Sequence, residues 1–388
     1  MTPQQKFSSD GFALKLALFY AAYFLYGGIQ LPFFPLWLEA RGLSAREIGF
    51  VIAIPMVVRI VFTPLIGHQA DRRSALKSTL VIAAGAGCVA MAVVGLVQGF
   101  VAIMAAVIVA AIAYAPLLSL SDAYAMNGLR VRNRAYGPVR LWGSVSFIVG
   151  NIGAGSLLGF IEPGQLIWLV VAGLFVTFMA AVALVPLEPN PPRSETVMHS
   201  PRSLWRNPAF VLVAAAASLT QSSHAFYYGF STLEWRAMGV SGTVIGVLWG
   251  IGVLAEVLLF AVSSRFAALA PTLMIAFGAF GAVIRWAAMA LDPPPAWLAA
   301  IQVLHAASFA ATHIGAMAFL ARAVPRELAA TAQGTLATVG GILTASATGI
   351  SGLIYAASGS LTYLMMAAMA GVGCVCALAA RRFQRAGS

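Results

Sequence analysis

Eight ionisable side chains stand inside long apolar stretches of this 388-residue chain. A charged group deep in a lipid bilayer is costly, so each of the eight is a candidate functional residue. Such groups hold charged solutes or carry protons when they occur in membranes. They comprise three arginines, two carboxylates and three histidines: Arg59, Arg140, Arg285, Asp122, Glu256, His224, His305 and His313.

One pair stands at equal distances from a basic turn. Asp122 lies nine residues before Val131, the centre of that turn, and Arg140 lies nine residues after it. In an antiparallel helical hairpin both would lie roughly 13 Å from the turn. They can therefore pair with each other or share a ligand. A buried ion pair that only locks two helices together is the alternative.

A second set of groups shares one depth in the C-terminal half. Glu256 and Arg285 are each about fourteen residues from the turn at Ala270–Pro271, or roughly 21 Å along a helix. Counts from the neighbouring turns place His224 and His305 near the same depth. Such counts fix depth but not which face of a helix each side chain occupies. His313 lies roughly 12 Å nearer the cytoplasm and is expected to be structural.

The buried charges do not cancel. Three arginines stand against two carboxylates, which leaves one positive charge if the histidines are neutral. An uncompensated buried charge is expensive, and a substrate carboxylate would offset it. The balance favours an anionic small-molecule substrate, although a chloride ion or a backbone group would also serve.

The elements that hold these groups are predicted to be membrane-spanning helices. The chain is 61% hydrophobic and 9% charged, whereas a soluble domain is roughly a quarter charged. A spanning helix needs about 20 apolar residues, and eleven turn signals divide the chain into twelve spans. The signals lie at Arg41–Gly42, Asp71–Arg73, Gln98–Gly99, Arg130–Arg134, Glu162–Gly164, Pro186–Pro208, Gly239, Ala270–Pro271, Asp292–Pro295, Val324–Pro325 and Ser358–Gly359.

Basic residues are distributed unequally between the two sides. With the N-terminus inside, sixteen lysines and arginines fall on the cytoplasmic side and three on the outer side. This positive-inside bias predicts a multi-pass protein of the plasma membrane, the inner membrane of a bacterium, with both termini in the cytoplasm. It also accounts for most of the net charge of +11. We therefore expect the basic residues to face a lipid bilayer and not a nucleic acid. We also expect the protein to be a monomer.

An internal repeat divides the chain. Gly42–Gly49 and Gly239–Gly246 share four residues at an offset of 197. The repeat predicts an N-terminal six-helix half (1–186), a cytoplasmic linker (187–207) and a C-terminal six-helix half (208–388). Two parallel halves are typical of transporters that bind their substrate near the midplane of the membrane.

A loop motif indicates a family. Gly67-x-x-x-Asp71-Arg72-Arg73, between the second and third spans, resembles the gating-loop signature of the major facilitator superfamily. Further stretches are similar to its phenylpropionate permease branch, a relative of lactose permease: Val139–Ser144, His224–Phe230, Arg285–Trp286 and Gln302–His305. The resemblance implies an all-α integral membrane fold of twelve transmembrane helices, proton-coupled symport by alternating access, and an aromatic carboxylate as substrate.

The resemblance also suggests roles for residues. The lactose permease group holds its sugar with an acid on span 4 and an arginine on span 5, the positions of Asp122 and Arg140. It also has an acid three residues after the histidine of span 10, where this chain has Ser308. We therefore expect proton coupling at Glu256, with His305 and then Asp122 as alternatives. Burial and a nearby arginine bias the protonation of a carboxyl group in opposite directions.

The substrate-binding set follows from these arguments. Arg59 is included because the repeat offset places it opposite Glu256 in the other half, and the tyrosines and tryptophan because they lie in the matching stretches. Glu234 is expected at the outer rim. The expected binding residues are Arg59, Asp122, Arg140, Trp142, His224, Tyr227, Tyr228, Arg285 and His305.

No motif of an enzyme is present. The chain has no Walker loop, no H-E-x-x-H and no G-x-S-x-G motif, and neither a cofactor nor a metal is expected. Without an ATP site, transport must be driven by a gradient. The alternatives are a proton antiporter that exports a drug or metabolite, a sugar or nucleoside symporter, and a membrane receptor or assembly factor that does not transport.

Overall fold

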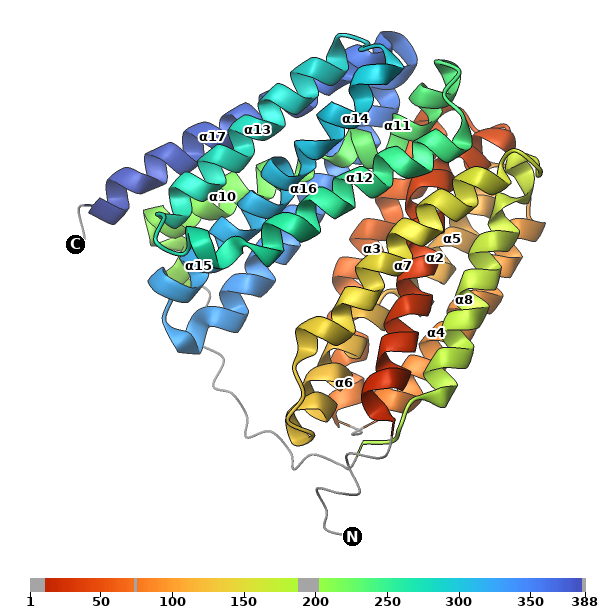
Figure 1. The fold of residues 1–388 in the computed structure, drawn as a ribbon, viewed down its shortest axis with the longest axis horizontal. Helices are drawn as coiled ribbons and strands as arrows, with labels where there is room; N and C mark the ends of the chain where they lie inside the picture. The colour runs from red at the N-terminus through yellow and green to blue at the C-terminus, as the bar shows by residue number, and fades with distance from the viewer. Residues whose placement is uncertain (1–10, 73–74, 188–201, 386–388) are drawn as a thin grey trace. The chain divides into compact units, whose positions relative to one another are not determined.

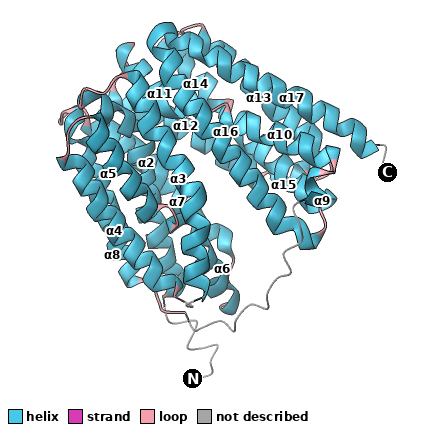
Figure 2. Cartoon of the chain, turned by 180° about the vertical axis from the view of Figure 1, so that it is seen from behind, coloured by secondary structure: helices cyan, strands magenta, loops and turns pink. Residues whose placement is uncertain are grey.

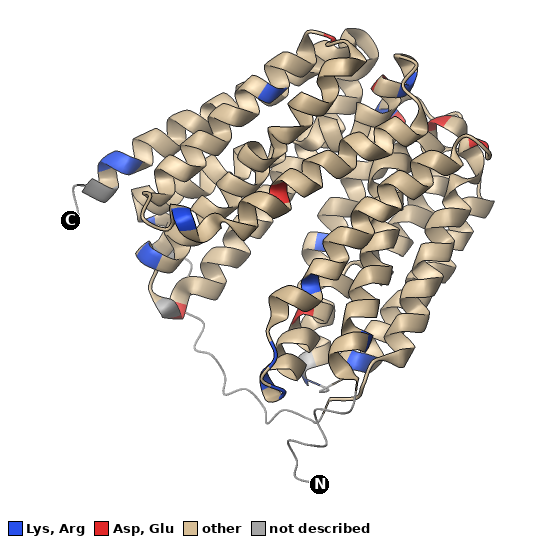
Figure 3. Cartoon of the chain, in the orientation of Figure 1, with Lys and Arg blue, Asp and Glu red and all other residues tan. Residues whose placement is uncertain are grey.

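The computed structural model describes residues 11–72, 75–187 and 202–385, and all regular structure in these ranges is helical (Figure 1, Figure 2). Ten stretches are long and apolar enough to cross a membrane. Most of each helix carries no charge (Figure 3). The all-helical membrane fold predicted from composition is therefore confirmed.

The chain forms two compact units. Of the described residues, unit 1 contains 11–44, 54–72, 75–187 and 241–247, and unit 2 contains 45–53, 202–240 and 248–385. Residues 188–201 of the segment expected as a linker lie outside the described part. Each unit is considered by itself below.

The N-terminal helices include one broken span. Pro116 separates α5 from α6, because proline has no N–H group to continue the helical hydrogen bonds. Pro32 and Pro35 lie inside α2. The elements are α2 (Phe12–Ala40), α3 (Ala45–Arg72), α4 (Leu76–Leu96), α5 (Phe100–Tyr114), α6 (Leu117–Val131), α7 (Tyr136–Leu157), η1 (Pro163–Gln165) and α8 (Leu166–Ala183).

The C-terminal helices include two broken spans. One breaks at Ser223–His224, between α10 and α11, and the other contains a π-helical turn, η3. The elements are α9 (Arg202–Trp205), α10 (Pro208–Ser222), α11 (Ala225–Ala237), α12 (Gly242–Ala261), η2 (Ser263–Phe266), α13 (Pro271–Ala290), α14 (Pro295–Val303), η3 (Ala306–Ala311), α15 (Thr312–Ala323), η4 (Arg326–Leu328), α16 (Ala329–Ser358), η5 (Gly359–Thr362) and α17 (Tyr363–Arg385).

The ten apolar stretches and the predicted twelve spans differ in number for two reasons. One stretch of 55 residues, Ala329–Phe383, includes both α16 and α17, which turn at Gly359. Helix α7 is not among the ten, since Arg140 and its serine and glycine residues lower its hydropathy. Counting α7 and α17 separately gives twelve spans within the described ranges.

Small residues let the helices of each unit pack closely. In unit 1, α2 packs most extensively on α7, and a Cβ atom on Gly150 would lie 2.6 Å from the carbonyl oxygen of Leu25. In unit 2, α13 packs on α17, α15 and η3. Glycine at such positions allows two helix backbones to approach, as is common in membranes.

The π turn lies directly against two glycines of α13. A Cβ atom on Gly281 would lie 2.7 Å from the Cβ of Ala307. One on Gly278 would overlap the Thr312 hydroxyl and lie 2.8 Å from the Ala307 carbonyl oxygen. This contact holds η3 next to the following turns of α13, where Arg285 is located.

Substituting Gly278 by alanine should therefore destabilise the protein. Overpacking a close contact costs about 1–3 kcal/mol, so we expect Gly278→Ala to lower the thermal unfolding midpoint of the purified protein in detergent. Gly371→Ala in α17 is the matched control, because the nearest heavy atom to its added Cβ, on Val283, is 4.0 Å away. Equal midpoints for the two variants would contradict the close packing.

Candidate functional site

Unit 2 contains a cluster of polar side chains around Arg285. Arg285 is fully buried in α13. Its NH1 group contacts the His305 Nδ1 at 2.8 Å and donates to the Ser308 hydroxyl at 3.3 Å, while its NH2 group donates to the Gln302 side-chain oxygen at 2.6 Å. None of these three partners carries a fixed negative charge. They come from α14 and η3, which the glycines of α13 bring close.

The contact with Arg285 determines where His305 carries its proton. A guanidinium group only donates hydrogen bonds, so the Nδ1 atom of His305 must accept and the neutral ring must carry its hydrogen on Nε2. The Nε2 atom lies 3.5 Å from the Oε2 atom of Glu256 in α12. The His305 ring thus lies between Arg285 and Glu256.

His224 joins the same cluster at the break between α10 and α11. Its Nδ1 atom lies 3.1 Å from the Gln221 carbonyl oxygen, and its Nε2 atom lies 3.0 Å from the Ser308 hydroxyl. The carbonyl can only accept, so Nδ1 carries the hydrogen and Nε2 accepts from Ser308. Ser308 therefore accepts from Arg285 and donates to His224. The centroids of the His224 and His305 rings are 5.2 Å apart.

Aromatic rings surround the guanidinium group of Arg285. Its central carbon lies 4.6 Å from the Tyr227 ring centroid and 4.5 Å from that of Trp286. Tyr227 stacks on Trp249, and Tyr228 stacks on His224. Cation–π contacts favour a buried cation. The structure thus brings together all the C-terminal candidates: His224, Tyr227, Tyr228, Glu256, Arg285 and His305.

Unit 1 holds a second polar cluster, around Asp122 in α6. The Oδ1 atom of Asp122 accepts hydrogen bonds from the Tyr20 hydroxyl at 2.6 Å and the Tyr136 hydroxyl at 2.7 Å. Two short hydroxyl bonds to one oxygen stabilise the ionised carboxylate. They also fix its position between α2 and α7, which supply the two tyrosines.

The two mid-span arginines of unit 1, Arg59 and Arg140, contact aromatic rings. The guanidinium carbon of Arg140 lies 3.9 Å from the Phe24 ring centroid and 5.4 Å from that of Tyr20. That of Arg59 lies 6.0 Å from the Tyr114 centroid. Tyr23 interacts electrostatically with Arg59, Arg140 and Asp122. Three charged groups, two of them positive, are therefore grouped around tyrosines of α2 and α5.

The remaining candidates are placed differently. Trp142 is 56% exposed and lies about 200° around α7 from Arg140, so the two do not share a helix face. Gly67 lies in α3 and Arg72 ends that helix. Asp71 also belongs to α3, but its side chain lies outside the described part, as does the whole of Arg73. Glu234, which was expected at the outer rim, has a side chain that is only 8% exposed.

Several polar residues of the two clusters were not predicted. Tyr20, Tyr136 and Gln302 are uncharged. Their burial in a membrane costs less free energy than that of a charged group, so they do not stand out as candidate functional residues. Spacing could have indicated two of them: Tyr136 stands four residues before Arg140, and Gln302 three residues before His305. Residues at these spacings lie on one face of a helix.

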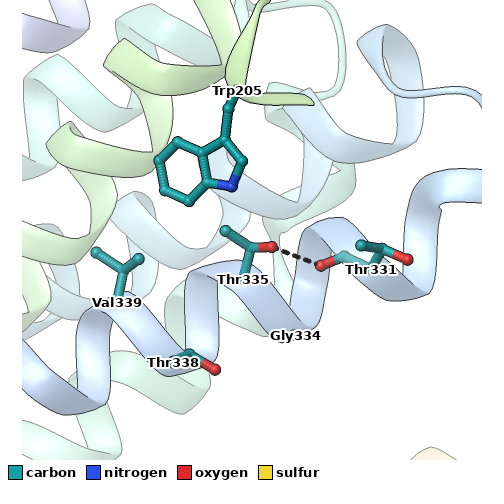
Figure 4. A pocket seen from close by; sticks show the side chains of 6 residues that line it. All are labelled: Trp205, Thr331, Gly334, Thr335, Thr338 and Val339. Atoms are coloured by element: carbon teal, nitrogen blue, oxygen red, sulfur yellow. Dashed lines mark hydrogen bonds between the residues drawn. The ribbon is translucent and has the colours of Figure 1, made fainter. Parts of the chain in front are cut away.

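A hollow in unit 2 lies apart from these clusters. The Trp205 indole of α9 stands over a face of α16 formed by Thr331, Gly334, Thr335, Thr338 and Val339 (Figure 4). None of these side chains is ionisable, and none belongs to the predicted set. Further along α16, the Gly340 carbonyl accepts a hydrogen bond from Ser222, two residues before His224.

Known proteins resemble the chain over most of its length. Residues 13–365 match the model of the MFS_1 like family. The chain is 33% identical over 311 residues to the probable 3-phenylpropionic acid transporter of Escherichia coli (strain K12), which covers 79% of this chain and 81% of that protein. It is 28% identical over 343 residues to the maltose permease of Geobacillus stearothermophilus, and this match covers 83% of this chain and 82% of that protein.

The fold also matches solved structures. The crystal structure of the nucleoside transporter NupG (D323A mutant) has a TM-score of 0.79 at 17% identity, covering 96% of this chain and 99% of that one. A bacterial homologue of the human lysosomal transporter Spinster, in an inward-facing and unoccupied conformation, has a TM-score of 0.74 at 15% identity, covering 99% and 98%. At these identities the likeness concerns the fold alone.

Removing the Ser308 hydroxyl should destabilise the cluster of unit 2. Ser308→Ala leaves His224 without its donor and Arg285 without one acceptor, and such a loss costs about 1–3 kcal/mol. We expect a lower thermal unfolding midpoint in detergent. Ser231→Ala is the control, since Ser231 is equally buried and its hydroxyl forms no hydrogen bond within the described residues. If both variants melt with the wild type, the hydrogen bonds of Ser308 contribute nothing.

Proposed function

The chain belongs to the MFS_1 like family of transporters, and we propose that it carries a small organic anion, such as an aromatic carboxylate, together with protons. It is a multi-pass membrane transporter of the major facilitator type. Secondary active transport by alternating access suits a chain with no nucleotide-binding motif.

The observation that carries this proposal is the charge of the cluster in unit 1. Arg59 and Arg140 provide two positive charges there, and Asp122 provides one negative charge that accepts from two tyrosines. In unit 2, by contrast, Arg285 is accompanied by Glu256 through His305. The uncompensated positive charge therefore belongs to unit 1. A carboxylate substrate would neutralise it, and the planar fork of an arginine suits a carboxylate.

The rings of unit 1 support an aromatic substrate. Tyr23, Phe24 and Tyr114 lie next to the two arginines. They offer apolar faces beside the proposed anion site, as a ring-bearing carboxylate requires. The similarity to a probable 3-phenylpropionic acid transporter supports the same class of substrate.

Proton coupling is proposed for unit 2. Glu256 can exchange a proton beside the His305 ring, 3.5 Å away, and His305 is oriented by Arg285. Protonation of Glu256 would remove the negative charge that accompanies Arg285, and so alter the electrostatics of the whole cluster. If protonation and substrate binding influence each other, linkage requires the influence to be mutual. His305 and Asp122 are the alternative proton carriers.

The membrane placement is part of the proposal. The excess of basic residues on one side supports a bacterial inner membrane with both termini in the cytoplasm. The segment of Gly67, Asp71, Arg72 and Arg73, at and after the end of α3, is proposed to control the change between conformations, and the protein is proposed to act as a monomer.

A neutral sugar or nucleoside is the second candidate substrate. Similarity to a maltose permease supports it, and so does a 24% identity over 226 residues to a putative nucleoside transporter of Escherichia coli (strain K12), which covers 55% of this chain and 52% of that protein. Export by proton antiport is distinguished by imposing a proton gradient of each sign on vesicles. Uptake by symport requires the proton gradient to point inward.

Arg140→Lys tests the anion site. Lysine keeps the charge but loses the planar fork that holds a carboxylate with two hydrogen bonds. Affinity for 3-phenylpropionate, measured by calorimetry on the purified protein, should fall at least tenfold, which corresponds to about 1.4 kcal/mol. Arg134→Lys, at an exposed position six residues earlier, should bind like the wild type. Unchanged affinity in Arg140→Lys would remove Arg140 from the site.

Glu256→Gln tests proton coupling. Glutamine imitates the protonated carboxyl group, so the variant should still exchange substrate across the membrane in counterflow but fail to accumulate it against a gradient. Both activities are measured in the same vesicles, with Glu327→Gln at an exposed position of unit 2 as control. Accumulation at the wild-type level would show that Glu256 does not carry the proton, and would leave Asp122 and His305 as candidates.

A further inference from the structure

Glu234 in α11 is a buried carboxyl group outside the two clusters. Its side chain is 8% exposed, and neither carboxyl oxygen forms a hydrogen bond within the described residues. On the same helix, the hydroxyl groups of Ser231 and Thr232 are buried and also lack partners in that part of the chain. An ionised carboxylate in such a place would be very costly, so the neutral acid is favoured.

Among the described residues, no cation acts on this carboxyl group. The titratable groups that act on it are Tyr363, at the start of α17, and Asp292, in the turn after α13. The Tyr363 hydroxyl lies beside the carboxyl group, and no hydrogen bond of normal geometry joins the two. On its own helix, Arg236 is exposed. Its described titratable neighbours are thus a phenol and a second acid, and neither carries a positive charge.

Aromatic side chains connect Glu234 to the Arg285 cluster. Tyr227 stands seven residues before Glu234, which is about two turns along the same face of α11. Its ring lies against Arg285. Tyr363 stacks on Trp286, whose ring also lies against Arg285. Two stacked rings, Tyr363 and Trp286, therefore stand between Glu234 and the buried guanidinium, and a change of charge at Glu234 would act across them.

We propose that Glu234 is a second proton-binding site of this transporter, distinct from Glu256. Its ligand is a proton, which the buried carboxyl group binds when it is accessible to water and releases when its surroundings favour the ionised form. Deprotonation creates a negative charge beside Tyr363, at the far end of the ring pair that contacts Arg285, and protonation removes it. This inference extends the proposed proton coupling, but it concerns a residue that the coupling at Glu256 does not require.

The test is infrared spectroscopy of the full-length protein in lipid nanodiscs at a series of pH values. The spectrum of the wild type minus that of Glu234→Gln should contain the C=O band of one protonated carboxyl group at neutral pH. As the pH rises, this band should be replaced by carboxylate bands. Glu327→Gln, at an exposed position, should give no such band in its own difference spectrum at neutral pH. Glu234→Asp keeps a carboxyl group and should shift the band, which provides a second variant if the glutamine substitution does not fold.

Two results would overturn the proposal. One is a difference spectrum without a protonated carboxyl band at any pH, and the other is a band that persists unchanged across the whole pH series. The measurement needs no transport, so it is independent of the proposed function. Failure of Glu256→Gln to uncouple transport would leave the Glu234 result standing, and failure of Glu234 to titrate would leave coupling at Glu256 standing.

Discussion

The burial of the Arg285 guanidinium group is the constraint on which the rest of unit 2 depends. A full positive charge among apolar helices must be satisfied by hydrogen bonds and by nearby electron-rich groups. Glycines at Gly278 and Gly281 allow the π turn η3 to approach α13. That approach supplies His305, Ser308 and Gln302 as partners. The breaks in two spans therefore coincide with the positions where polar side chains are needed.

The charged side chains of the two units have different kinds of neighbours. In unit 1, the Asp122 carboxylate accepts from two tyrosines while Arg140 rests on Phe24. In unit 2, the carboxylate of Glu256 faces a histidine that is bonded to Arg285. The first arrangement keeps a fixed negative charge and leaves cations for a ligand. The second connects a carboxyl group to a cation through a group that can itself gain a proton, which suits proton coupling.

The sequence predicts depth in the membrane better than it predicts the direction of a side chain. Because the helical rise per residue is fixed, counting from the turns placed Glu256, Arg285 and the two histidines at one level, and the structure brings them together. No feature of this sequence predicts which face of a helix is turned toward the interior of its unit. Only the rotation of one residue relative to another on the same helix follows from spacing, which places Trp142 about 200° from Arg140. The burial of Glu234 did not follow from its place near a turn. Neutral partners such as Gln302 were missed because only charged residues stand out in an apolar helix.

The central claim is that the substrate is an anion, and ligand-induced stabilisation of the purified chain tests it most directly. A ligand that binds the native state at a hundred times its dissociation constant stabilises it by about 2.7 kcal/mol. The comparison is 3-phenylpropionate against its uncharged primary amide, with maltose and a nucleoside alongside. The account predicts that the carboxylate raises the thermal unfolding midpoint and the three neutral compounds do not. An equal rise with the amide, or a rise with a neutral sugar or nucleoside alone, would contradict it.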